Sequence, residues 1–272
     1  MIEYINKKIH GLQISNSQFE NPILFVGAGP GDPELITVKG QKALQKADLV
    51  IYAGSLVPET ILRWTAPETD TISSASMHLE EIICAMQTAH AQGKRVVRLH
   101  TGDPSLYGAV FEQMAELTKR SIPYKVIPGV TAAFAAAAAL GIEYTLPEIA
   151  QTLILTRMAG RTAVPDKENL KSLAAHQTSM VIYLSISMVD EIAPILTAAY
   201  GERSTCAVVY RASQPEEKIF VARLKDLSET VKAENITHHA LIIVGKVLDV
   251  DPVNLQHKSK LYQKDFRHNY RS

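Results

Sequence analysis

The fold class of this chain is indicated by the stretch Ile23-Leu-Phe-Val-Gly-Ala-Gly-Pro-Gly-Asp-Pro33. A short apolar run that ends in glycines is typical of a buried parallel strand followed by a tight turn. After the turn, Ile36, Ala43 and Leu44 recur at helical spacing and share one face. The sequence therefore predicts a strand, a glycine loop and a helix, which together open a parallel α/β sheet.

The same alternation of strand and helix continues to about residue 145. Further strands are expected at 49–52, 95–99 and 124–127, and further helices at 79–90 and 106–117. Alternation of this kind is typical of a mainly parallel sheet that is covered by helices on both faces. Residues 22–145 are therefore expected to form a first α/β domain.

The pattern breaks between Gly141 and Glu148 and then restarts. The later strands are expected at 153–156, 180–184, 205–210, 218–222 and 240–244, and the later helices at 188–199 and 224–231. The short connection at 213–216 is typical of an antiparallel hairpin. Residues 146–248 therefore predict a second α/β domain with a mixed sheet, and residues 1–21 and 249–272 are expected to be peripheral extensions.

The composition argues against several classes of protein. Lys and Arg together number 28, as do Asp and Glu, so no net charge attracts nucleic acid or an anionic membrane. The longest apolar stretch, 129–142, is shorter than the ~20 residues that a spanning helix needs, and no targeting segment is recognised. Cys84 and Cys206 lie in apolar runs and are expected to be buried thiols. We expect a cytoplasmic enzyme without nucleic-acid or membrane partners.

The first glycine loop, Gly27 to Pro33, does not fit the dinucleotide-binding pattern. Its third glycine is Gly31, Pro30 lacks a backbone donor, and no acidic residue ends the second expected strand. Backbone amides at this point could face an anion, or the glycines could simply permit a tight strand-to-helix turn. Both interpretations stay open, while an NAD-binding oxidoreductase is disfavoured.

A second loop, His100-Thr-Gly-Asp-Pro-Ser-Leu-Tyr-Gly108, follows the third expected strand. Open α/β sheets bind ligands at such strand ends beside a switch in strand order. Asp103 could accept hydrogen bonds from ribose hydroxyls, and Gly102 would let a flat ligand approach the backbone. Alternatively, Asp103 or Ser105 caps a helix that carries Leu106. The two interpretations are compatible.

Three other stretches could carry chemistry. In the loop 127–133, Thr131 could cap the following Ala-rich helix or contact an adenine edge. Arg157 and Arg161 follow a strand in a glycine-containing loop, where they could recognise carboxylates or lie solvated. The pair His238-His239 has no Cys, His or Asp partner at ligand spacing, so no protein-bound metal is expected.

Four stretches, taken in order along the chain, carry a family resemblance. They are Gly27-Ala-Gly-Pro-Gly-Asp-Pro33, Thr101-Gly-Asp-Pro-Ser-Leu-Tyr-Gly108, Ile127-Pro-Gly-Val-Thr-Ala132 and Ala240-Leu-Ile-Ile-Val-Gly245. Together they resemble the tetrapyrrole methylase family over about residues 22–248. Within it, Ala75-Ser-Met-His-Leu-Glu-Glu-Ile82 and Leu155-Thr-Arg-Met-Ala-Gly-Arg-Thr162 are similar to the group that methylates C-11 of precorrin-4, including its cobalt form. Ala163 departs from that group, in which proline is expected.

The resemblance implies an S-adenosylmethionine-dependent methyltransferase of two α/β domains, commonly a homodimer, which releases S-adenosylhomocysteine. Its substrate would be precorrin-4 or cobalt-precorrin-4, in cobalamin biosynthesis, and the sequence does not say whether the ring contains cobalt. A uroporphyrinogen-III or another precorrin methyltransferase is the alternative within the family. A non-catalytic tetrapyrrole- or nucleotide-binding module is the alternative outside it.

The resemblance also implies the residues of the site. The implied cofactor contacts are Gly102, Asp103, Leu106, Thr131, Ala132, Tyr183, Leu184, Ala212 and Ala240. Because the substrate carries many carboxylates, Arg157 and Arg161 are expected to bind it, with Asp32 and His78 as further polar contacts. The accepting carbon gains a fourth carbon substituent, so no residue is assigned as a catalytic acid or base.

Overall fold

The computed structural model describes residues 21–255, 259, 266 and 267 of the 272-residue chain. It divides into two compact units, Met1–Thr131 and Ala132–Ser272. Within the described ranges, no helix combines the length and the apolar character needed to cross a membrane. Residues 1–20 and most of the expected C-terminal extension lie outside the described residues.

The first unit contains a five-stranded sheet in the order β3-β2-β4-β1-β5. Its strands are β1 (Ile23–Gly27), β2 (Leu49–Tyr52), β3 (Asp70–Ser73), β4 (Val96–His100) and β5 (Tyr124–Ile127). All four neighbouring pairs are parallel, which confirms the predicted parallel sheet. Strand β3 was not expected from the sequence, because all its residues are exposed and it therefore lacks an apolar pattern.

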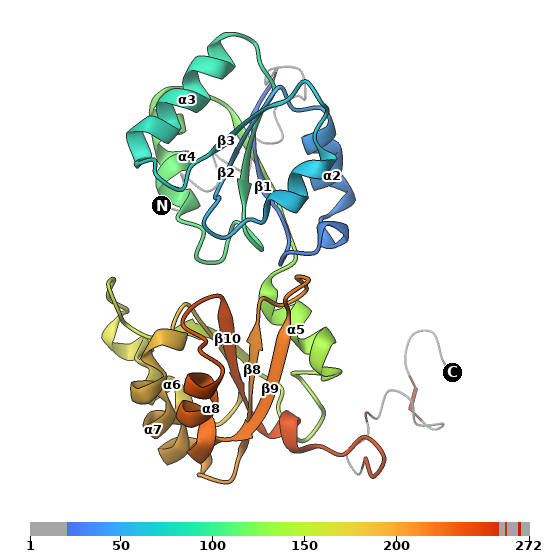
Figure 1. Ribbon diagram of the computed structural model, residues 1–272, viewed down its shortest axis with the longest axis vertical. Helices are drawn as coiled ribbons and strands as arrows, with labels where there is room; N and C mark the ends of the chain where they lie inside the picture. Colours follow the sequence, from blue (N-terminus) through green and yellow to red (C-terminus); the bar gives the residue numbers. More distant parts are fainter. Residues whose placement is uncertain (1–20, 256–258, 260–265, 268–272) are drawn as a thin grey trace. The chain divides into compact units, whose positions relative to one another are not determined.

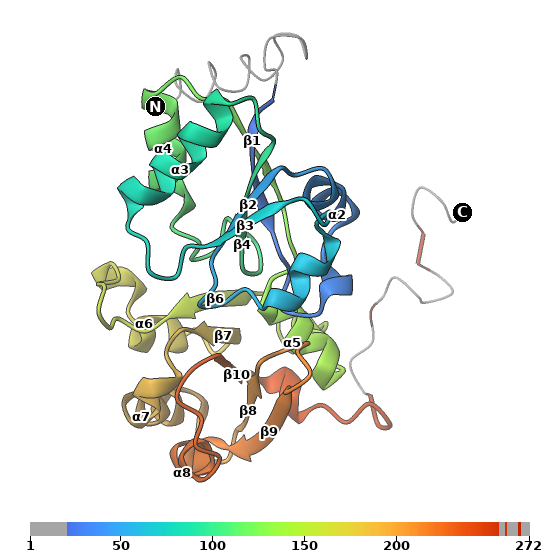
Figure 2. The ribbon, with the colours of Figure 1, turned by 45° about the horizontal axis from the view of Figure 1, so that its top comes forward.

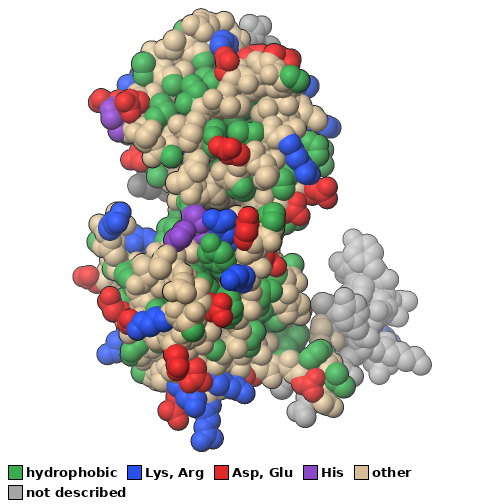
Figure 3. Space-filling view, in the orientation of Figure 1, with side chains coloured by type: hydrophobic (Ala, Val, Ile, Leu, Met, Phe, Trp, Pro, Cys, Tyr) green, Lys and Arg blue, Asp and Glu red, His purple; other side chains and the backbone are tan. Residues whose placement is uncertain are grey.

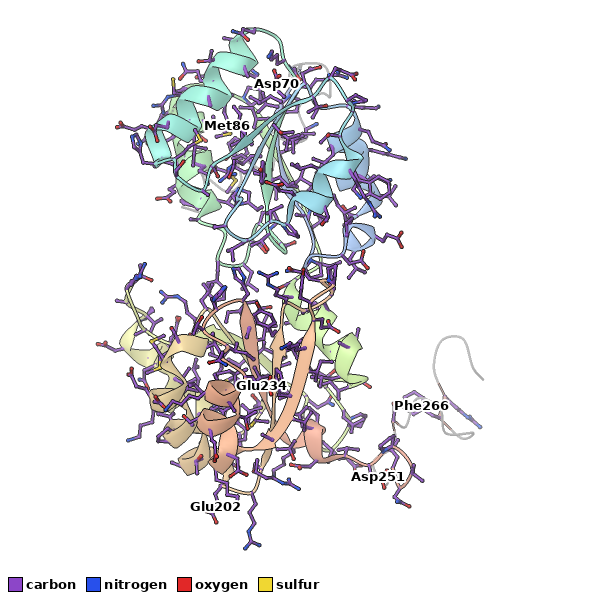
Figure 4. The ribbon with its side chains drawn as sticks, viewed as in Figure 1. Asp70, Met86, Glu202, Glu234, Asp251 and Phe266 are labelled. Atoms are coloured by element: carbon purple, nitrogen blue, oxygen red, sulfur yellow. The ribbon has the colours of Figure 1, made fainter. Side chains whose placement is uncertain are left out.

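Helices cover both faces of this sheet (Figure 1). They are α2 (Val38–Gln45), α3 (Leu79–Ala91) and α4 (Val110–Lys119), with the 3₁₀ turns η1 (Pro33–Leu35) and η2 (Glu59–Trp64). Successive side chains of β4 point to opposite faces of the sheet and so enter two different cores. Val97 and Leu99 pack on the α2 side, whereas Val96 packs on the side of α3 and α4. Met86 is fully buried and lies between α3 and the sheet in Figure 4.

The strand order reverses between β1 and β4. Helix α2 leads from β1 toward β2 on one side, whereas α4 leads from β4 to β5 on the other. The loops after these two adjacent strands therefore leave the sheet in opposite directions. In open α/β sheets, ligands bind at the carboxyl ends of the strands at such a reversal.

The second unit contains a five-stranded sheet in the order β6-β7-β10-β8-β9. Its strands are β6 (Leu153–Arg157), β7 (Ser179–Tyr183), β8 (Thr205–Tyr210), β9 (Lys218–Arg223) and β10 (Ala240–Val244). Strands β6 and β7 are parallel and the other three pairs are antiparallel, which confirms the predicted mixed sheet. The expected hairpin is the pair β8 and β9.

Helices α6 (Leu170–Ala174), α7 (Val189–Tyr200) and α8 (Leu227–Ala233) pack on one face of this sheet, and α5 (Ala132–Leu140) packs on the other (Figures 1 and 2). The 3₁₀ turns are η3 (Asp166–Glu168), η4 (Ile186–Met188), η5 (Leu224–Asp226) and η6 (Lys246–Asp249). Ala133 and Ala136 of α5 are fully buried, and their small side chains let the helix approach the strands closely. Helix α5 therefore belongs to the second unit, whereas the sequence pattern predicts a first domain that ends at residue 145.

Two local expectations are corrected by the structure. Cys206 is buried, but Cys84 is exposed because it lies on the opposite side of α3 from Ile83 and Met86. Helix α4 begins at Val110, so Leu106 lies in a loop and not in a helix. Asp249, the first residue of the expected C-terminal extension, ends η6 and accepts a hydrogen bond from the Thr205 hydroxyl.

Candidate functional site

Three loops at the carboxyl end of the first sheet meet at glycines. Gly27 ends β1, Gly102 follows β4 and Gly129 follows β5; we call these three residues the glycine junction. A Cβ atom on Gly129 would lie 2.1 Å from the carbonyl oxygen of Gly102, and one on Gly27 would lie 2.6 Å from the same oxygen. No larger residue fits at either position without movement of the backbone.

The first and second loops are also joined by hydrogen bonds. The amide of Gly102 donates to the carbonyl of Gly29 over 2.8 Å, and the amide of Gly29 donates back over 3.2 Å. Gly102 has a φ of +58°, which glycine adopts without steric cost, and its missing side chain faces Thr131. The structure thus brings Gly102 and Thr131 together, and the first loop uses its glycines for close backbone contact.

Asp103 connects the second loop to the third. Its carboxylate accepts hydrogen bonds from the backbone amide of Gly129 over 2.8 Å and from the amide and hydroxyl of Ser105. Burial alone would raise the pKa of Asp103, but these hydrogen bonds outweigh it and lower the pKa below the ordinary value of 3.8. Asp103 therefore holds loops together and does not cap α4, whose N-cap is Ala109.

A buried polar cluster lies in β4 and α4, directly beside this loop. Its members are Arg98, His100 and Gln113, each at most 5% exposed. Burial lowers the pKa of Arg98 to about 10, so the guanidinium stays charged at neutral pH. Burial, together with the charge of Arg98, lowers the pKa of His100 to about 3, so the imidazole is neutral there. Sequence reasoning missed this cluster, although basic residues at alternate positions of an otherwise apolar strand were a usable signal.

The second unit presents its implied cofactor residues at one edge of its sheet, where β6, β7 and β8 end and β10 begins. Ala240 starts β10 and pairs with Tyr210 at the end of β8. Tyr183 ends β7, and its hydroxyl accepts a hydrogen bond over 2.9 Å from Ala133, in the first turn of α5. We call this the β7–β10 edge, and it also carries Ala132, Leu184 and Ala212.

Four non-glycine residues at the β7–β10 edge have left-handed backbone conformations. They are Leu184, Arg211, Ser213 and His239, with φ angles between 47° and 65°. Such conformations cost about 1–2 kcal/mol for most residues and gather at functional sites. Leu184 is also 60% exposed, which is unusual for a leucine at the end of a buried strand.

The two arginines of the fourth loop have different surroundings. Arg157 ends β6, and its guanidinium donates hydrogen bonds to the carbonyls of Met158, Thr162 and Ala163 in its own loop. Arg161 is exposed and forms no hydrogen bond or ion pair with another described residue. Arg157 therefore shapes the loop, while Arg161 is available to a ligand.

Asp32 and His78 both begin helical segments at the carboxyl side of the first sheet. Asp32 caps η1 by accepting from the amide of Glu34 over 2.8 Å. The backbone amide of His78 donates to Glu81 over 2.9 Å at the start of α3. His78 follows β3, which β2 and β4 separate from β1, so the structure does not bring it to the glycine junction.

The described residues contain no group of three or more His, Cys, Asp and Glu side chains that could hold a metal ion. On the face drawn in Figure 3, acidic and basic side chains are interspersed over each unit. The residues implied in the site are mainly glycine backbone in the first unit and small or apolar side chains at the β7–β10 edge of the second.

Comparisons with known proteins give a consistent result. The sequence profile of a family described as tetrapyrrole (corrin/porphyrin) methylases matches residues 22–228. A cobalt-precorrin-4 C(11)-methyltransferase of Methanocaldococcus jannaschii is 53% identical over 92% of this chain and 95% of its own length. The X-ray structure of a cobalt precorrin-4 methyltransferase, a cobalamin biosynthetic enzyme, matches with a TM-score of 0.83 and 42% identity over 87% of this chain and all of its own. A uroporphyrin-III C-methyltransferase of Thermus thermophilus, complexed with S-adenosylhomocysteine, matches with a TM-score of 0.66 and 28% identity over 84% of this chain and 93% of its own.

Proposed function

The chain belongs to the tetrapyrrole methylase family, and we propose on that basis that it transfers the methyl group of S-adenosylmethionine to C-11 of cobalt-precorrin-4 in cobalamin biosynthesis. The observation that carries the proposal is the 53% identity, over 92% of the chain, to a protein named for this reaction. The β4 loop (residues 101–109, which follow β4) and the β7–β10 edge supply residues of the kind that the reaction needs.

The proposed cofactor contacts fit an adenosyl group. From the first unit they are Gly102, Asp103, Leu106 and Thr131, and from the second they are Ala132, Tyr183, Leu184, Ala212 and Ala240. The side chains of Ala212 and Ala240 are buried, so the contacts there would come from backbone atoms, whereas the exposed side chain of Leu184 offers an apolar surface for the ring. The carboxylate of Asp103 retains acceptor capacity for ribose hydroxyls.

The catalytic task of these residues would be alignment. When bound, S-adenosylmethionine supplies a methyl group on a positively charged sulfonium. The apolar side chains of Leu106 and Leu184 would not oppose a reaction that removes this charge. The surrounding residues must hold the accepting carbon about 3–3.5 Å from the methyl carbon and in line with the methyl–sulfur bond. Such positioning can account for much of the rate enhancement. We assign no catalytic acid or base.

Arg161 is the proposed contact for the carboxylates of the ring, with Asp32 and His78 as further polar contacts. Because its guanidinium is exposed and forms no bond within the described chain, Arg161→Ala is expected to raise the substrate KM about ten-fold, with cofactor affinity within two-fold of wild type. Arg157→Ala is the matched comparison, because it removes three hydrogen bonds that shape the loop and should lower kcat as well. Equal losses in both affinities for Arg161→Ala would contradict the assignment.

The deciding experiment is methyl transfer to a reconstituted substrate. The purified chain would receive S-adenosylmethionine labelled at the methyl carbon and, in separate reactions, cobalt-precorrin-4, precorrin-4 and uroporphyrinogen III. The label would then be located by NMR. Label at C-11 with faster turnover of the cobalt ring is the expected result. Transfer to uroporphyrinogen III alone, or to none of the rings, would overturn the proposal.

The proposal includes a homodimer that acts in the cytoplasm without nucleic-acid, membrane or protein-bound metal partners. The balance of 28 basic and 28 acidic residues supports the absence of a nucleic-acid partner. Light scattering of the protein as it elutes from a size-exclusion column would measure the mass of the assembly. Metal analysis of the same fraction would test for a bound ion. A stable monomer or a stoichiometric metal would contradict this part of the proposal.

A further inference from the structure

The buried cluster of Arg98, His100 and Gln113, beside the β4 loop, contains a charge that packing alone does not explain. Arg98 is 4% exposed and no carboxylate of the described residues forms an ion pair with it. Burying a charged group without an opposite charge is costly, and an apolar side chain would fill the same space at lower cost. The hydrogen bonds of Arg98 therefore indicate what it contributes.

These hydrogen bonds form a chain that ends in the loop. The Nε of Arg98 donates to the Oε1 of Gln113 over 3.0 Å, and its Nη1 donates to the carbonyl of Ile51 at the end of β2 over 3.1 Å. The Nε2 of Gln113 in turn donates to the carbonyl of Ala109 over 3.3 Å. Arg98 thus fixes Gln113 in the orientation that directs its amide group to the end of the loop.

The end of the loop needs such support. Tyr107 and Ala109 both have left-handed backbone conformations, with φ angles of 54° and 47°, which are unfavourable for residues that carry a Cβ atom. Between them, a Cβ atom on Gly108 would lie 2.7 Å from the carbonyl oxygen of Pro104, so the loop is tightly folded on itself. A backbone in this state persists only where surrounding contacts determine it.

We propose that Arg98 and Gln113 are positioning residues that hold the β4 loop, residues 101–109, in the conformation that binds the cofactor. The start of this loop is fixed by the glycine junction and by Asp103, and its end is fixed by the chain from Arg98 through Gln113 to Ala109. The inference rests on the proposed function, because that function assigns Gly102, Asp103 and Leu106 to the cofactor.

The substitution Gln113→Glu separates positioning from packing. A glutamate keeps an acceptor for Arg98 and gives it an opposite charge, but it cannot donate to the carbonyl of Ala109. We expect S-adenosylhomocysteine, measured by titration calorimetry, to bind three to ten times more weakly, while the melting temperature stays equal to or above that of wild type. The KM for S-adenosylmethionine should rise, with kcat at saturating cofactor and the KM of the ring within two-fold of wild type.

Two further variants complete the test. The double variant Arg98→Met with Gln113→Leu removes both buried polar groups and should weaken cofactor binding by a similar factor. Arg95→Met is the control, since Arg95 lies just before β4 and forms an exposed ion pair with Asp48; it should bind S-adenosylhomocysteine as wild type does. Wild-type affinity in Gln113→Glu, or weakened binding that appears only in variants with a lowered melting temperature, would overturn the inference.

The binding series also separates this inference from the proposed function. A wild-type protein that binds S-adenosylhomocysteine but methylates no ring would refute the function, while the affinities of the variants would still decide the role of Arg98 and Gln113. A wild-type protein that does not bind S-adenosylhomocysteine at all would overturn both.

Discussion

In the first unit, the carboxyl end of the sheet is lined by the glycine backbone of the glycine junction. In the second unit, the β7–β10 edge is lined by side chains whose backbone is left-handed. At the glycine junction, Gly27, Gly102 and Gly129 pack against one another so tightly that no Cβ atom fits on two of them. At the β7–β10 edge, Leu184 and Arg211 have φ angles that glycine would adopt more easily, yet both carry large side chains.

This difference indicates what each edge contributes. A backbone-lined edge offers amides and carbonyls at close range, and its shape depends on the absence of side chains. A side-chain-lined edge keeps its shape through the surrounding sheet and contributes apolar or charged contacts, at a cost in backbone strain. The first edge should therefore respond to substitution through structure, and the second through lost contacts.

The largest expected effect is that of Gly129→Ala. The added methyl group would lie 2.1 Å from the carbonyl oxygen of Gly102 and 2.8 Å from the Cα of Gly27, so the loops must separate. Overpacking of this kind costs about 1–3 kcal/mol, and it also displaces the amide that donates to Asp103. We expect S-adenosylhomocysteine affinity to fall about 100-fold, measured by calorimetry, together with a lower free energy of unfolding.

Gly141→Ala provides the matched control. Gly141 also has a positive φ, of +65°, but a Cβ atom there would meet nothing within 4 Å. It should cost about 1 kcal/mol of stability through the backbone alone and leave cofactor affinity unchanged. Equal affinity losses in the two variants would show that the close packing of the glycine junction is not what shapes the site.

A smaller effect is expected for Asp103→Asn. In the wild type, one carboxylate oxygen accepts from the amide of Gly129 and the other accepts from Ser105. The asparagine side chain has only one oxygen, so one of these acceptors is lost, and hydrogen bonds to a charged group contribute about 1.5–3 kcal/mol. Cofactor affinity should fall about ten-fold. Because the pKa of Asp103 is lower in the folded chain than its ordinary value of 3.8, its contribution to stability is complete well above pH 4 and is lost as the pH falls through the folded pKa.

Denaturant unfolding of both proteins between pH 3 and pH 7 tests this pH dependence. The stability difference between wild type and Asp103→Asn should be constant from about pH 5 upward and should shrink below about pH 4. Asp70→Asn, which removes an exposed ion pair with Lys94, should change neither affinity nor the pH profile appreciably. A difference that grows toward low pH would contradict the role of Asp103 as a charged acceptor between the loops.

The repeating apolar patterns predicted most strands and the two classes of sheet, because burial fixes which strand residues are apolar. Strand β3 carries no such signal, since all four of its residues are exposed. Helix α5 is apolar nearly all round, so its sequence did not say which sheet it covers. The sequence pattern therefore predicts a domain boundary after α5, whereas the units divide before it.

The candidate site was predictable only where its chemistry is local. The loops that carry Gly102, Asp103 and Arg161 were recognised by their position after strands and by their family resemblance. The hydrogen bond from the amide of Gly129 to Asp103 joins residues 26 positions apart, so no pattern near Asp103 in the sequence predicts it. The helix that was expected to include Leu106 begins at Val110, because Tyr107 and Ala109 have left-handed backbone conformations that no local rule assigns to tyrosine or alanine.

The smallest expected effect, of opposite sign on stability and affinity, is that of Leu184→Gly at the β7–β10 edge. Leu184 has a φ of 54°, and glycine there should raise the free energy of unfolding by about 0.5–1 kcal/mol, because relief of the left-handed strain exceeds the entropy cost of glycine. Its side chain is 60% exposed, so its loss removes little packing from the free protein. It would remove the proposed apolar contact with the cofactor, and we expect about five-fold weaker binding of S-adenosylhomocysteine.

Ser121→Gly separates the two parts of this prediction. Ser121 also has a φ of 54°, but it lies in the turn between α4 and the start of β5, at the opposite end of the first sheet from the glycine junction. It should gain a similar amount of stability and bind the cofactor as wild type does. If Leu184→Gly gained stability without losing affinity, the strained backbone at the β7–β10 edge would have no function in binding, and the contrast between the two edges would be one of structure alone.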